Sequence, residues 1–370
     1  MTGVIPPVVN ILYDGHVFRW QKGTGGVSRY FHAIISRLPR DWVPTLLGVD
    51  AGAGHLPAHP QLATSPLSAF RPRRLSQPLK RAYWKLRLLR SANLVHPTYY
   101  NLTGGLTFSD IKCPVVVTAH DFIAATYPKL EDGAEATIRS QREAFLAATH
   151  VVCVSRFTEQ DLLDRYPQMA GKTTVIHHGS SFPICTESQP NAIFEKPTFL
   201  FIGNRATYKN FPLLLRAFAK ACQFHPAIRL RVVGAPLSME EKWQVYFLGV
   251  MDRVDSSVYP NESSLQDLYR QSVALLYPSR HEGFGIPPLE AMACGTIAVA
   301  SNTTSLPEVV GDAGILLDPT DEDLWADWIL QIARQQIARD DLLEKGRKRA
   351  GLLSWERSAK RHVELYRQLA

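Results

Sequence analysis

The sequence of 370 residues is poor in cysteine, and none of its cysteines forms a Cys-x-x-Cys pair. An odd number of scattered thiols argues against a disulfide framework or a structural zinc site, and it favours the reducing environment of a cytoplasm. The five positions are Cys113, Cys153, Cys185, Cys222 and Cys294.

Long apolar runs are missing as well. No run approaches the roughly 18 residues that a membrane-spanning helix needs. The first residues, Met1-Thr-Gly-Val-Ile-Pro-Pro7, have neither the basic region nor the long apolar core of a secretory signal. Internal repeats and low-complexity tracts are also absent. We therefore expect a cytoplasmic protein with an ordinary globular fold.

The composition is that of a soluble globular protein, with 45% hydrophobic and 20% charged residues. A chain of this length is too long for one ordinary core and suits two domains. The formal net charge of +7 favours partners such as nucleic acid, anionic lipid or phosphorylated small molecules.

The positive charge is concentrated between Arg71 and Arg90, a segment with eight Lys or Arg residues and no acidic residue. Four apolar residues recur there at helical spacing, which predicts an amphipathic helix. Its basic face is either simply solvated or rests on an anionic membrane surface. The four residues are Leu79, Tyr83, Leu86 and Leu89.

The stretch of 19 residues from Tyr277 to Gly295 carries most of the chemistry. Short apolar runs precede and follow it, and each has the length of a buried strand. Pro287 and Pro288 suit the first turn of a helix, where a missing N–H costs nothing, and Gly295 suits its C-terminal end. The pattern therefore predicts strand, loop, short helix and strand.

Two carboxylates lie on this stretch, Glu282 before the Gly283-Phe284-Gly285 loop and Glu290 inside the helix. A helix N-terminus attracts anions, and a carboxylate can accept two adjacent sugar hydroxyls. Together they suggest a nucleotide-sugar site, although a loop Glu and a Glu favoured by the helix dipole remain the alternative.

A second phosphate-compatible arrangement lies near the N-terminus. A strand over 8–13 is followed by a loop and by glycines at 23, 25 and 26 that open an apolar helix running to about residue 38. The spacing is not Gly-x-Gly-x-x-Gly, so the dinucleotide fingerprint is absent. Alone, a Gly-Gly pair before a helix is more often a turn than a site.

His120 and Asp121 follow a strand predicted over 114–119, at the end where open α/β sheets keep their ligand crevice. Asp121 either orients the imidazole or caps a turn. In the second half a strand over 198–203 leads into Arg205 and Lys209 and then a helix over 212–222. Two cations at a helix entrance suit a diphosphate, with an exposed basic turn as the alternative.

The remaining segments complete an alternating α/β pattern, which predicts two parallel-sheet domains. We expect exposed loops over 50–70 and a domain linker over 180–197. Asp321-Glu-Asp323 matches a metal-binding Asp-x-Asp motif in text only, because it opens a helix and helix capping explains it. Further strands are expected over 151–155, 174–179 and 229–234. Helices are expected over 135–148, from 155 with Ser155 as its cap, and over 355–369.

Several of these segments resemble the family-four glycosyltransferases of the GT-B fold. The string His-Glu-Gly-Phe-Gly-Ile-Pro-Pro-Leu-Glu-Ala-Met-Ala-Cys-Gly over 281–295 resembles the Glu-x7-Glu signature of that family. Gly-Gly-Val-Ser-Arg-Tyr-Phe over 25–31, His-Asp-Phe-Ile over 120–123 and Gly-Asn-Arg-x-x-x-Lys-Asn over 203–210 resemble its other motifs. The resemblance extends from about Ile11 to the C-terminus.

The resemblance implies an α/β protein with two Rossmann-like domains facing a cleft. The first domain is expected at 1–182 together with a returning C-terminal helix at 355–370, and the second at 195–354. It further implies a retaining, metal-independent hexosyltransferase that uses a nucleoside-diphosphate sugar, with GDP-mannose or a UDP-hexose favoured. The acceptor would be a glycan or lipid-linked saccharide. No cofactor, metal or nucleic acid is expected. Peripheral association with the membrane is expected.

Residue roles follow from the same resemblance. Arg205 and Lys209 would hold the diphosphate, helped by Gly25 and Gly26 of the other domain. Glu290 would bind the ribose hydroxyls. His120 and Glu282 would be the catalytic residues at the donor sugar, Glu282 by positioning rather than covalent attack. The backbone N–H groups that would hold the sugar are those of Phe284, Gly285 and Ile286.

Two rival functions remain open from the sequence. One is epimerisation of a nucleotide sugar by the same fold, which would need no acceptor. The other is a non-catalytic protein that binds a nucleotide sugar or associates with lipid. The intact set of two cations and two glutamates argues against the second rival.

Overall fold

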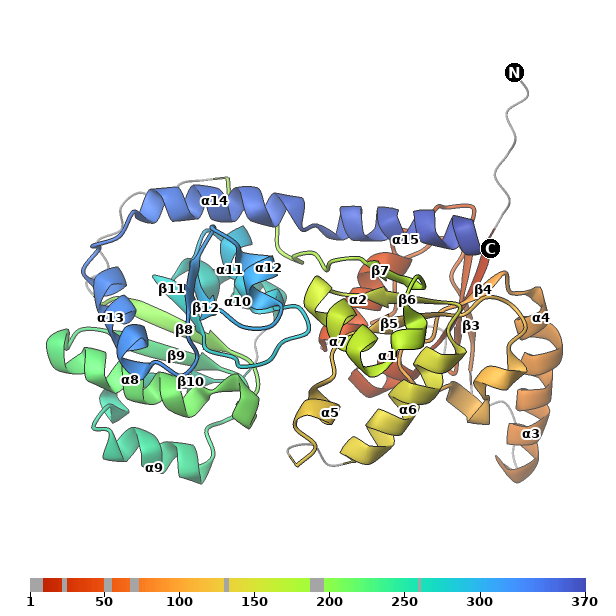
Figure 1. Cartoon of the computed structure of the whole chain (residues 1–370), viewed down its shortest axis with the longest axis horizontal. Coiled ribbons are helices and arrows are strands. Elements are labelled where there is room, and N and C mark those ends of the chain that lie inside the picture. Colours follow the sequence, from red (N-terminus) through yellow and green to blue (C-terminus); the bar gives the residue numbers. More distant parts are fainter. Residues whose placement is uncertain are drawn as a thin grey trace, which may run out of the picture. The chain divides into compact units, whose positions relative to one another are not determined.

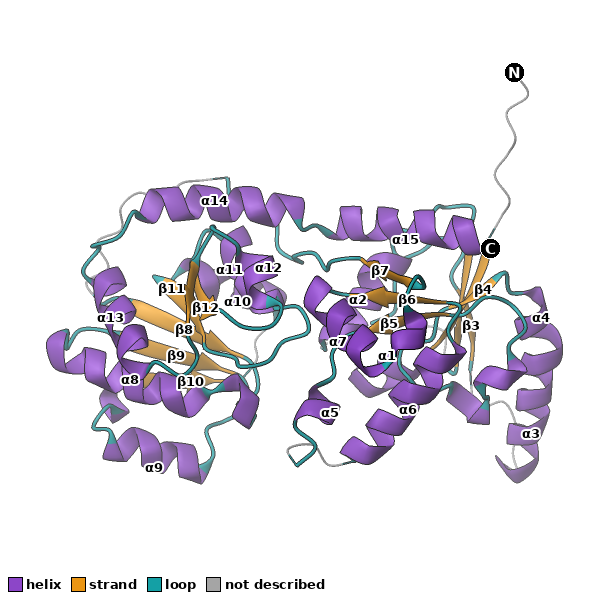
Figure 2. Ribbon diagram, viewed as in Figure 1, coloured by secondary structure: helices purple, strands orange, loops and turns teal. Residues whose placement is uncertain are grey.

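The computed structural model describes residues 9–21, 25–49, 55–66, 73–129, 133–186, 196–258 and 261–370 (Figure 1). The chain divides into two compact units. The first comprises Met1–His178 together with Trp355–Ala370, and the second comprises Gly179–Ser354. The C-terminal segment therefore belongs to the unit that contains the N-terminus. In both units helices flank parallel strands (Figure 2).

The first unit is built on parallel strands in two hydrogen-bonded groups, ordered β3-β2-β1-β4 and β5-β6-β7. A parallel bridge between Val95 and Val115 joins the two groups. The strand β5 is buried along its whole length, as expected for a sheet covered on both faces. The strands are β1 (Asn10–Asp14), β2 (Val43–Leu47), β3 (Ala63–Ser65), β4 (Leu94–Val95), β5 (Val116–Ala119), β6 (His150–Cys153) and β7 (Thr173–Val175).

Helices pack against this sheet, and the described residues form two apolar cores between helices and strands. One core contains side chains of α2 and α15, and the other contains side chains of α6 and α7. The C-terminal helix thus completes a core that begins with β1, which explains why it belongs to the first unit. The helices are α1 (His16–Gln21), α2 (Gly26–Ile35), α5 (Ile123–Thr126), α6 (Ala134–Ala147), α7 (Arg156–Arg165) and α15 (Trp355–Leu369).

The basic segment forms α3 (Arg73–Tyr83), a π-helical turn (Trp84–Leu88) and α4 (Leu89–Ser91). Residues 71 and 72 lie outside the described part of the chain. Trp84 is fully buried, and its indole N–H donates to Ser65 Oγ at 2.9 Å. The helical periodicity is confirmed, but Trp84 anchors the segment and Leu79, Tyr83 and Leu86 stay exposed.

The second unit has a parallel sheet in the order β10-β9-β8-β11-β12-β13. In chain order this is the arrangement 3-2-1-4-5-6 of a doubly wound fold, in which ligands bind at the carboxyl ends of the strands. The strands are β8 (Thr198–Ile202), β9 (Arg229–Val233), β10 (Val254–Ser257), β11 (Ala274–Tyr277), β12 (Ile297–Ser301) and β13 (Ile315–Leu317).

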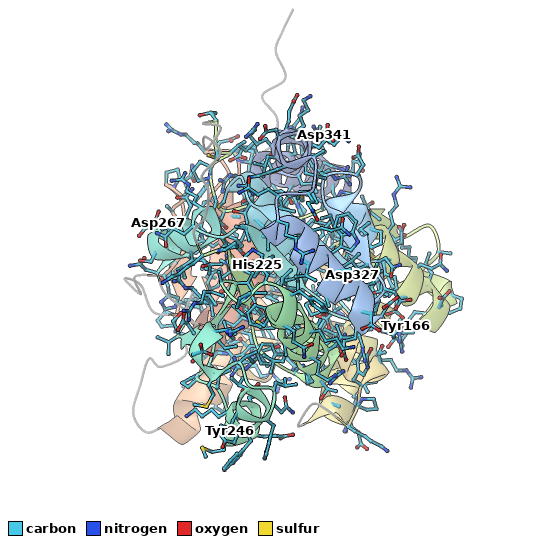
Figure 3. All side chains as sticks on the ribbon, turned by 90° about the vertical axis from the view of Figure 1, so that its left-hand side faces the viewer. Tyr166, His225, Tyr246, Asp267, Asp327 and Asp341 are labelled. Carbon is cyan, nitrogen blue, oxygen red and sulfur yellow. The ribbon has the colours of Figure 1, made fainter. Side chains whose placement is uncertain are left out.

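Among the helices of this unit, α8 and α13 share one apolar core with the sheet. The peripheral helix α9 instead turns large side chains outward, and Tyr246 lies at the edge of the molecule (Figure 3). The helices are α8 (Phe211–Phe224), α9 (Met239–Phe247), α10 (Glu262–Arg270), α11 (Ile286–Ala293), α12 (Leu306–Val310), α13 (Glu322–Ala333) and α14 (Arg339–Leu352).

The predicted α/β class with parallel sheets is confirmed. Local signals placed several boundaries correctly: Ser155 caps α7 by accepting from Thr158 N, and Asp321 caps α13 by accepting from Leu324 N. Two loop predictions are wrong, because residues 16–21 form α1 and residues 63–65 form β3. β3 pairs in parallel with β2, so its strand conformation depends on a partner that the local composition does not reveal.

Candidate functional site

The stretch from Tyr277 to Gly295 folds as predicted. It runs from the end of β11 through a loop into α11, and β12 follows. Gly285 is the residue before the helix and has a positive φ of 109°. The positive φ favours glycine, and a Cβ at Gly285 would lie 2.7 Å from Leu306 Cδ2 and displace that methyl group. Gly295 ends the helix with φ 76°.

Lys209 and Glu282 form an ion pair at the carboxyl ends of β8 and β11. Lys209 Nζ lies 2.6 Å from Glu282 Oε1 and donates to Tyr277 Oη at 2.9 Å. Burial, followed by the negative charge of Glu282, raises the pKa of Tyr277 well above its ordinary value. Tyr277 therefore stays a neutral hydroxyl at neutral pH. The ion pair joins a residue predicted for the diphosphate with one predicted for the sugar.

Arg205 is held by the second unit in a nearly buried position. Its side chain is 7% exposed, Nε lies 2.5 Å from Glu241 Oε1, and Nη2 donates to the Pro236 carbonyl at 2.8 Å. The remaining nitrogen, Nη1, is buried and makes no hydrogen bond to a described residue. This guanidinium is thus fixed in place while one of its nitrogens keeps its hydrogen-bonding capacity.

A close approach of two glycines makes room for the Arg205 guanidinium. A Cβ at Gly234 would lie 2.4 Å from the Gly203 carbonyl oxygen and 3.4 Å from Arg205 Nη1. These glycines end β9 and β8, so the strand ends meet without side chains. Any larger residue at 234 would displace the backbone or the guanidinium.

Glu290 lies on α11 and is fully buried. The hydroxyl of Tyr269, on α10, donates to Glu290 Oε2 at 3.0 Å. Sequence reasoning missed Tyr269, because no local pattern links a residue of α10 with one of α11. It holds the carboxylate in one orientation.

The loop before α11 is fixed by two residues that the sequence did not single out. The hydroxyl of Ser305 donates to the carbonyls of Glu282 and Phe284 at 2.9 and 2.7 Å. The Glu282 N–H donates to Thr304 Oγ at 3.1 Å. These hydrogen bonds therefore fix the backbone of the loop that leads through Phe284 and Gly285 into Ile286 at the start of α11.

In the first unit Gly25 and Gly26 stand at the start of α2, whereas residues 22–24 lie outside the described part of the chain. The side chain of Gln21 reaches forward along the chain and accepts from the Ser28 N–H at 2.9 Å. A Cβ at Gly25 would lie 2.1 Å from the Gln21 amide, so a side chain at this position would displace Gln21 from Ser28. Gln21 is a further residue that sequence reasoning missed.

His120 follows β5, as predicted. Its ring meets the edge of Tyr30 at 5.2 Å and stacks on His178 at 6.1 Å with an interplanar angle of 7°. Burial lowers the pKa of His120 to about 3, so its imidazole is neutral at physiological pH. It can donate or accept a hydrogen bond but does not act as a cation.

Asp121 closes the turn that precedes the short helix α5. Its Oδ1 accepts from the Ile123 N–H at 3.1 Å, and its carbonyl accepts from Gln141 Nε2 at 3.0 Å. The side chain and the carbonyl of Asp121 therefore both hold the backbone turn that follows His120.

A directed hydrogen-bond network lies beneath His120. His362 Nδ1 is 2.8 Å from the Ser358 carbonyl, which can only accept, so Nδ1 carries the hydrogen and Nε2 accepts from the Tyr30 hydroxyl at 2.7 Å. Tyr30 must then accept from Thr118 at 2.9 Å, and Thr118 from His96 Nε2 at 2.8 Å. The network ends where the Tyr366 hydroxyl donates to His96 Nδ1 at 2.6 Å. It ties α15 to α2 and β5 through neutral groups.

Comparisons with known proteins agree with this arrangement. Two protein-family models match the chain, "Glycosyltransferase Family 4" over residues 24–180 and "Glycosyl transferases group 1" over residues 186–349. The O-antigen chain mannosyltransferase B of Escherichia coli is 31% identical over 271 residues, which cover 69% of this chain and 70% of the relative. The chain belongs to the family-4 glycosyltransferases.

Solved structures of the same fold are similar over almost the whole chain. Sucrose-phosphate synthase from Thermosynechococcus elongatus matches with a TM-score of 0.74 at 22% identity, covering 98% of this chain and 99% of that one. Anabaena Alr3699/HepE in complex with UDP and glucose matches with a TM-score of 0.73 at 18% identity, covering 98% and 100%. This glycosyltransferase therefore has the GT-B fold expected from its motifs.

The predicted site residues of this glycosyltransferase fall into two groups, one on each unit. The second unit brings Lys209 and Glu282 into contact, and it fixes Arg205 and Glu290 through separate partners. Among the described residues no group of three or more His, Cys, Asp or Glu side chains is arranged to hold a metal ion. Likewise, within the described residues no helix is long and apolar enough to cross a membrane.

Proposed function

We propose that this protein is a retaining, metal-independent hexosyltransferase. It transfers a sugar from a nucleoside-diphosphate sugar, GDP-mannose or a UDP-hexose, to a glycan or lipid-linked saccharide. The observation that carries the proposal is the Lys209–Glu282 ion pair, hydrogen-bonded to Tyr277, at the carboxyl end of a doubly wound sheet. Next to it begins α11, whose N-terminal end favours negative charge.

In this proposal the second unit binds the donor. Arg205 and Lys209 hold the diphosphate and stabilise it as a leaving group, which is an electrostatic role. Glu290 accepts the ribose hydroxyls. Glu282 and the N–H groups of Phe284, Gly285 and Ile286 hold the sugar. His120, Gly25 and Gly26 are the contribution of the first unit.

The ion pair keeps two largely buried charges compensated before a donor binds. The side chains of Lys209 and Glu282 are only 13% and 11% exposed, so each compensates a charge that would be costly alone. A diphosphate brings further negative charge to Lys209, and Nη1 of Arg205, which makes no hydrogen bond to a described residue, is a further donor for it.

The choice of donor is supported by relatives. The Escherichia coli relative is named a mannosyltransferase, which favours GDP-mannose, and the HepE structure contains UDP and glucose. A thermal-shift screen against GDP-, UDP-, dTDP- and ADP-sugars tests this choice. A ligand present at 100 times its Kd adds about 2.7 kcal/mol to the free energy of unfolding.

The transfer reaction is tested with the donor that the screen identifies. Arg205→Ala combined with Lys209→Ala leaves the developing charge of the leaving group uncompensated, and turnover is expected to fall about 100-fold or more. Wild-type turnover in this double variant would remove the assignment. NMR of the product reports the anomeric configuration, and an inverted product would contradict retention.

The same assay separates the two rival functions. An epimerase would interconvert UDP-sugars without an acceptor, whereas a transferase needs one. A non-catalytic binder would show the thermal shift with no turnover of any donor–acceptor pair.

Peripheral association with an anionic membrane surface is part of the proposal and rests on the segment 71–90. Leu79 and Leu86 are 66% and 61% exposed, and Tyr83 is exposed beside them. Two of the cations are engaged, because Lys85 Nζ lies 2.5 Å and Arg81 Nη2 lies 3.5 Å from Asp110 carboxylate oxygens. The sequence supplies six more Lys or Arg residues over this segment.

Vesicle co-sedimentation tests the membrane proposal. Vesicles with anionic lipid should bind the protein more strongly than neutral ones, and salt should weaken that binding by screening. Replacing both Leu79 and Leu86 by Ser should reduce binding at all salt concentrations. Equal binding to both vesicle types at low salt would show that the basic face is only solvated.

A further inference from the structure

Three aromatic rings gather at the carboxyl ends of β1 and β4 in the first unit. His16 and Trp20 lie one turn apart on α1, and Tyr99 follows β4. The rings of His16 and Tyr99 stack at 5.9 Å with an interplanar angle of 12°, and the ring of Trp20 lies 5.9 Å from Tyr99 at 60°. We call these three residues the aromatic corner, because the Trp20 ring is inclined by 60° to the ring of Tyr99.

The aromatic corner faces solvent mainly through Trp20, because His16 and Tyr99 are half-buried and Tyr99 also packs against Tyr100 at 4.8 Å. Trp20 is 64% exposed, while its helix neighbours Val17 and Phe18 are fully buried. Contiguous exposed apolar surface marks binding sites, and here the rings of His16 and Tyr99 extend the exposed indole of Trp20. One face of α1 therefore packs into the core through Val17 and Phe18, and Trp20 lies on the exposed face.

The backbone on both sides of Tyr99 is anchored. Thr98 donates to Asp14 Oδ1 through its N–H at 2.6 Å and through its hydroxyl at 2.8 Å. Tyr100 is buried, and its hydroxyl accepts from the His120 N–H at 3.2 Å. Tyr99 thus stands on a rigid segment that is hydrogen-bonded directly to the backbone of the proposed catalytic histidine. Rigid placement of this kind is what a binding residue needs.

The chemistry of the corner fits a saccharide. A pyranose ring presents C–H groups on one face, and these are attracted to the negative face of an aromatic ring, while its hydroxyls need polar partners at the edge. The exposed side chains next to Trp20 are polar: Arg19 donates from Nη2 to Thr103 Oγ at 3.0 Å. A lipid-binding face would instead carry further exposed aliphatic residues, and the described part of α1 has none.

We propose that the aromatic corner of His16, Trp20 and Tyr99 is a subsite that stacks against a sugar ring of the saccharide acceptor. The inference rests on the proposed transferase function and adds to it the residues that grip the acceptor. Trp20 and Tyr99 act in binding and specificity and take no part in the chemical step.

The test measures binding of methyl glycosides of mannose, glucose, galactose and N-acetylglucosamine to the full-length protein, by saturation-transfer NMR and quenching of tryptophan fluorescence. At least one glycoside should bind the wild type. Trp20→Ala and Tyr99→Ala should each weaken that binding about tenfold or more, and Trp20→Phe should weaken it less because a ring remains. Phe224→Ala is the matched control, since Phe224 is 67% exposed on the other unit.

Three results would overturn the proposal: no glycoside binds the wild type, the Trp20 and Tyr99 variants bind like the wild type, or octanol binds at the corner and the glycosides do not. Thermal shifts of the wild type with UDP and GDP are measured in parallel. A glycoside response without any nucleotide response would contradict the transferase function and leave the sugar subsite standing. A nucleotide response without a glycoside response would do the reverse.

Discussion

The neutral network of the first unit predicts a specific loss of stability in acid. His362 is fully buried, and its Nε2 accepts the hydrogen of the Tyr30 hydroxyl. Burial, helped by the positive charge of Arg361, lowers the pKa of His362 from 6.5 to about 4. Protonation would place a hydrogen on the accepting nitrogen and break the network at the point where α15 meets α2.

The size and the pH range of the effect follow from these pKa values. The unfolded chain takes up the proton near pH 6.5, whereas the folded protein does so only near pH 4. Stability is therefore full above pH 6.5 and falls as the pH is lowered towards 4, by about 1.4 kcal/mol per pH unit from this one residue. Between pH 7.5 and pH 5.0 the expected loss is about 2 kcal/mol.

The variant His362→Gln isolates this contribution, because glutamine can accept from Tyr30 but does not titrate. Urea unfolding at pH 7.5 and 5.0, followed by hydrogen exchange of peptides from α15, gives the free energy of unfolding of the first unit. The wild type should lose about 2 kcal/mol more than the variant. His225→Gln removes a histidine of the other unit as a control. Equal losses in the wild type and His362→Gln would refute the reasoning.

Three further predictions concern the second unit. Glu290→Gln should mainly raise the KM for the donor, because ribose changes little during reaction. Glu282→Gln should mainly lower kcat. Near-normal KM and kcat in both variants would show that neither carboxylate faces the donor. Gly285→Ala should lower the free energy of unfolding by about 1–3 kcal/mol, since φ is 109° and a Cβ meets Leu306. Gly249→Ala, at positive φ with open space, is its control and should cost less. EDTA should leave transfer unchanged, and restoration of an EDTA-inhibited enzyme by manganese would contradict the proposed phosphate site.

The sequence alone determined the features that depend on neighbouring residues. Proline at the first turn and glycine at the end set the limits of α11, and hydroxyl or carboxylate caps started α7 and α13. Continuous apolar runs placed the buried strands, because a parallel sheet covered on both faces needs no polar alternation. The long matching motifs then identified the family and the candidate site residues.

Only the tertiary structure decided which partners those residues have. The contacts of Lys209 with Tyr277, Arg205 with Glu241 and Glu290 with Tyr269 join positions 68, 36 and 21 residues apart. Tyr30 and His362 are separated by 332 residues. Such contacts depend on how strands are ordered in the sheet and which helix covers which face, and a local pattern carries no record of either. For the same reason the sequence did not predict the strand β3, which pairs with β2, or the aromatic corner, which combines residues that follow β1 and β4.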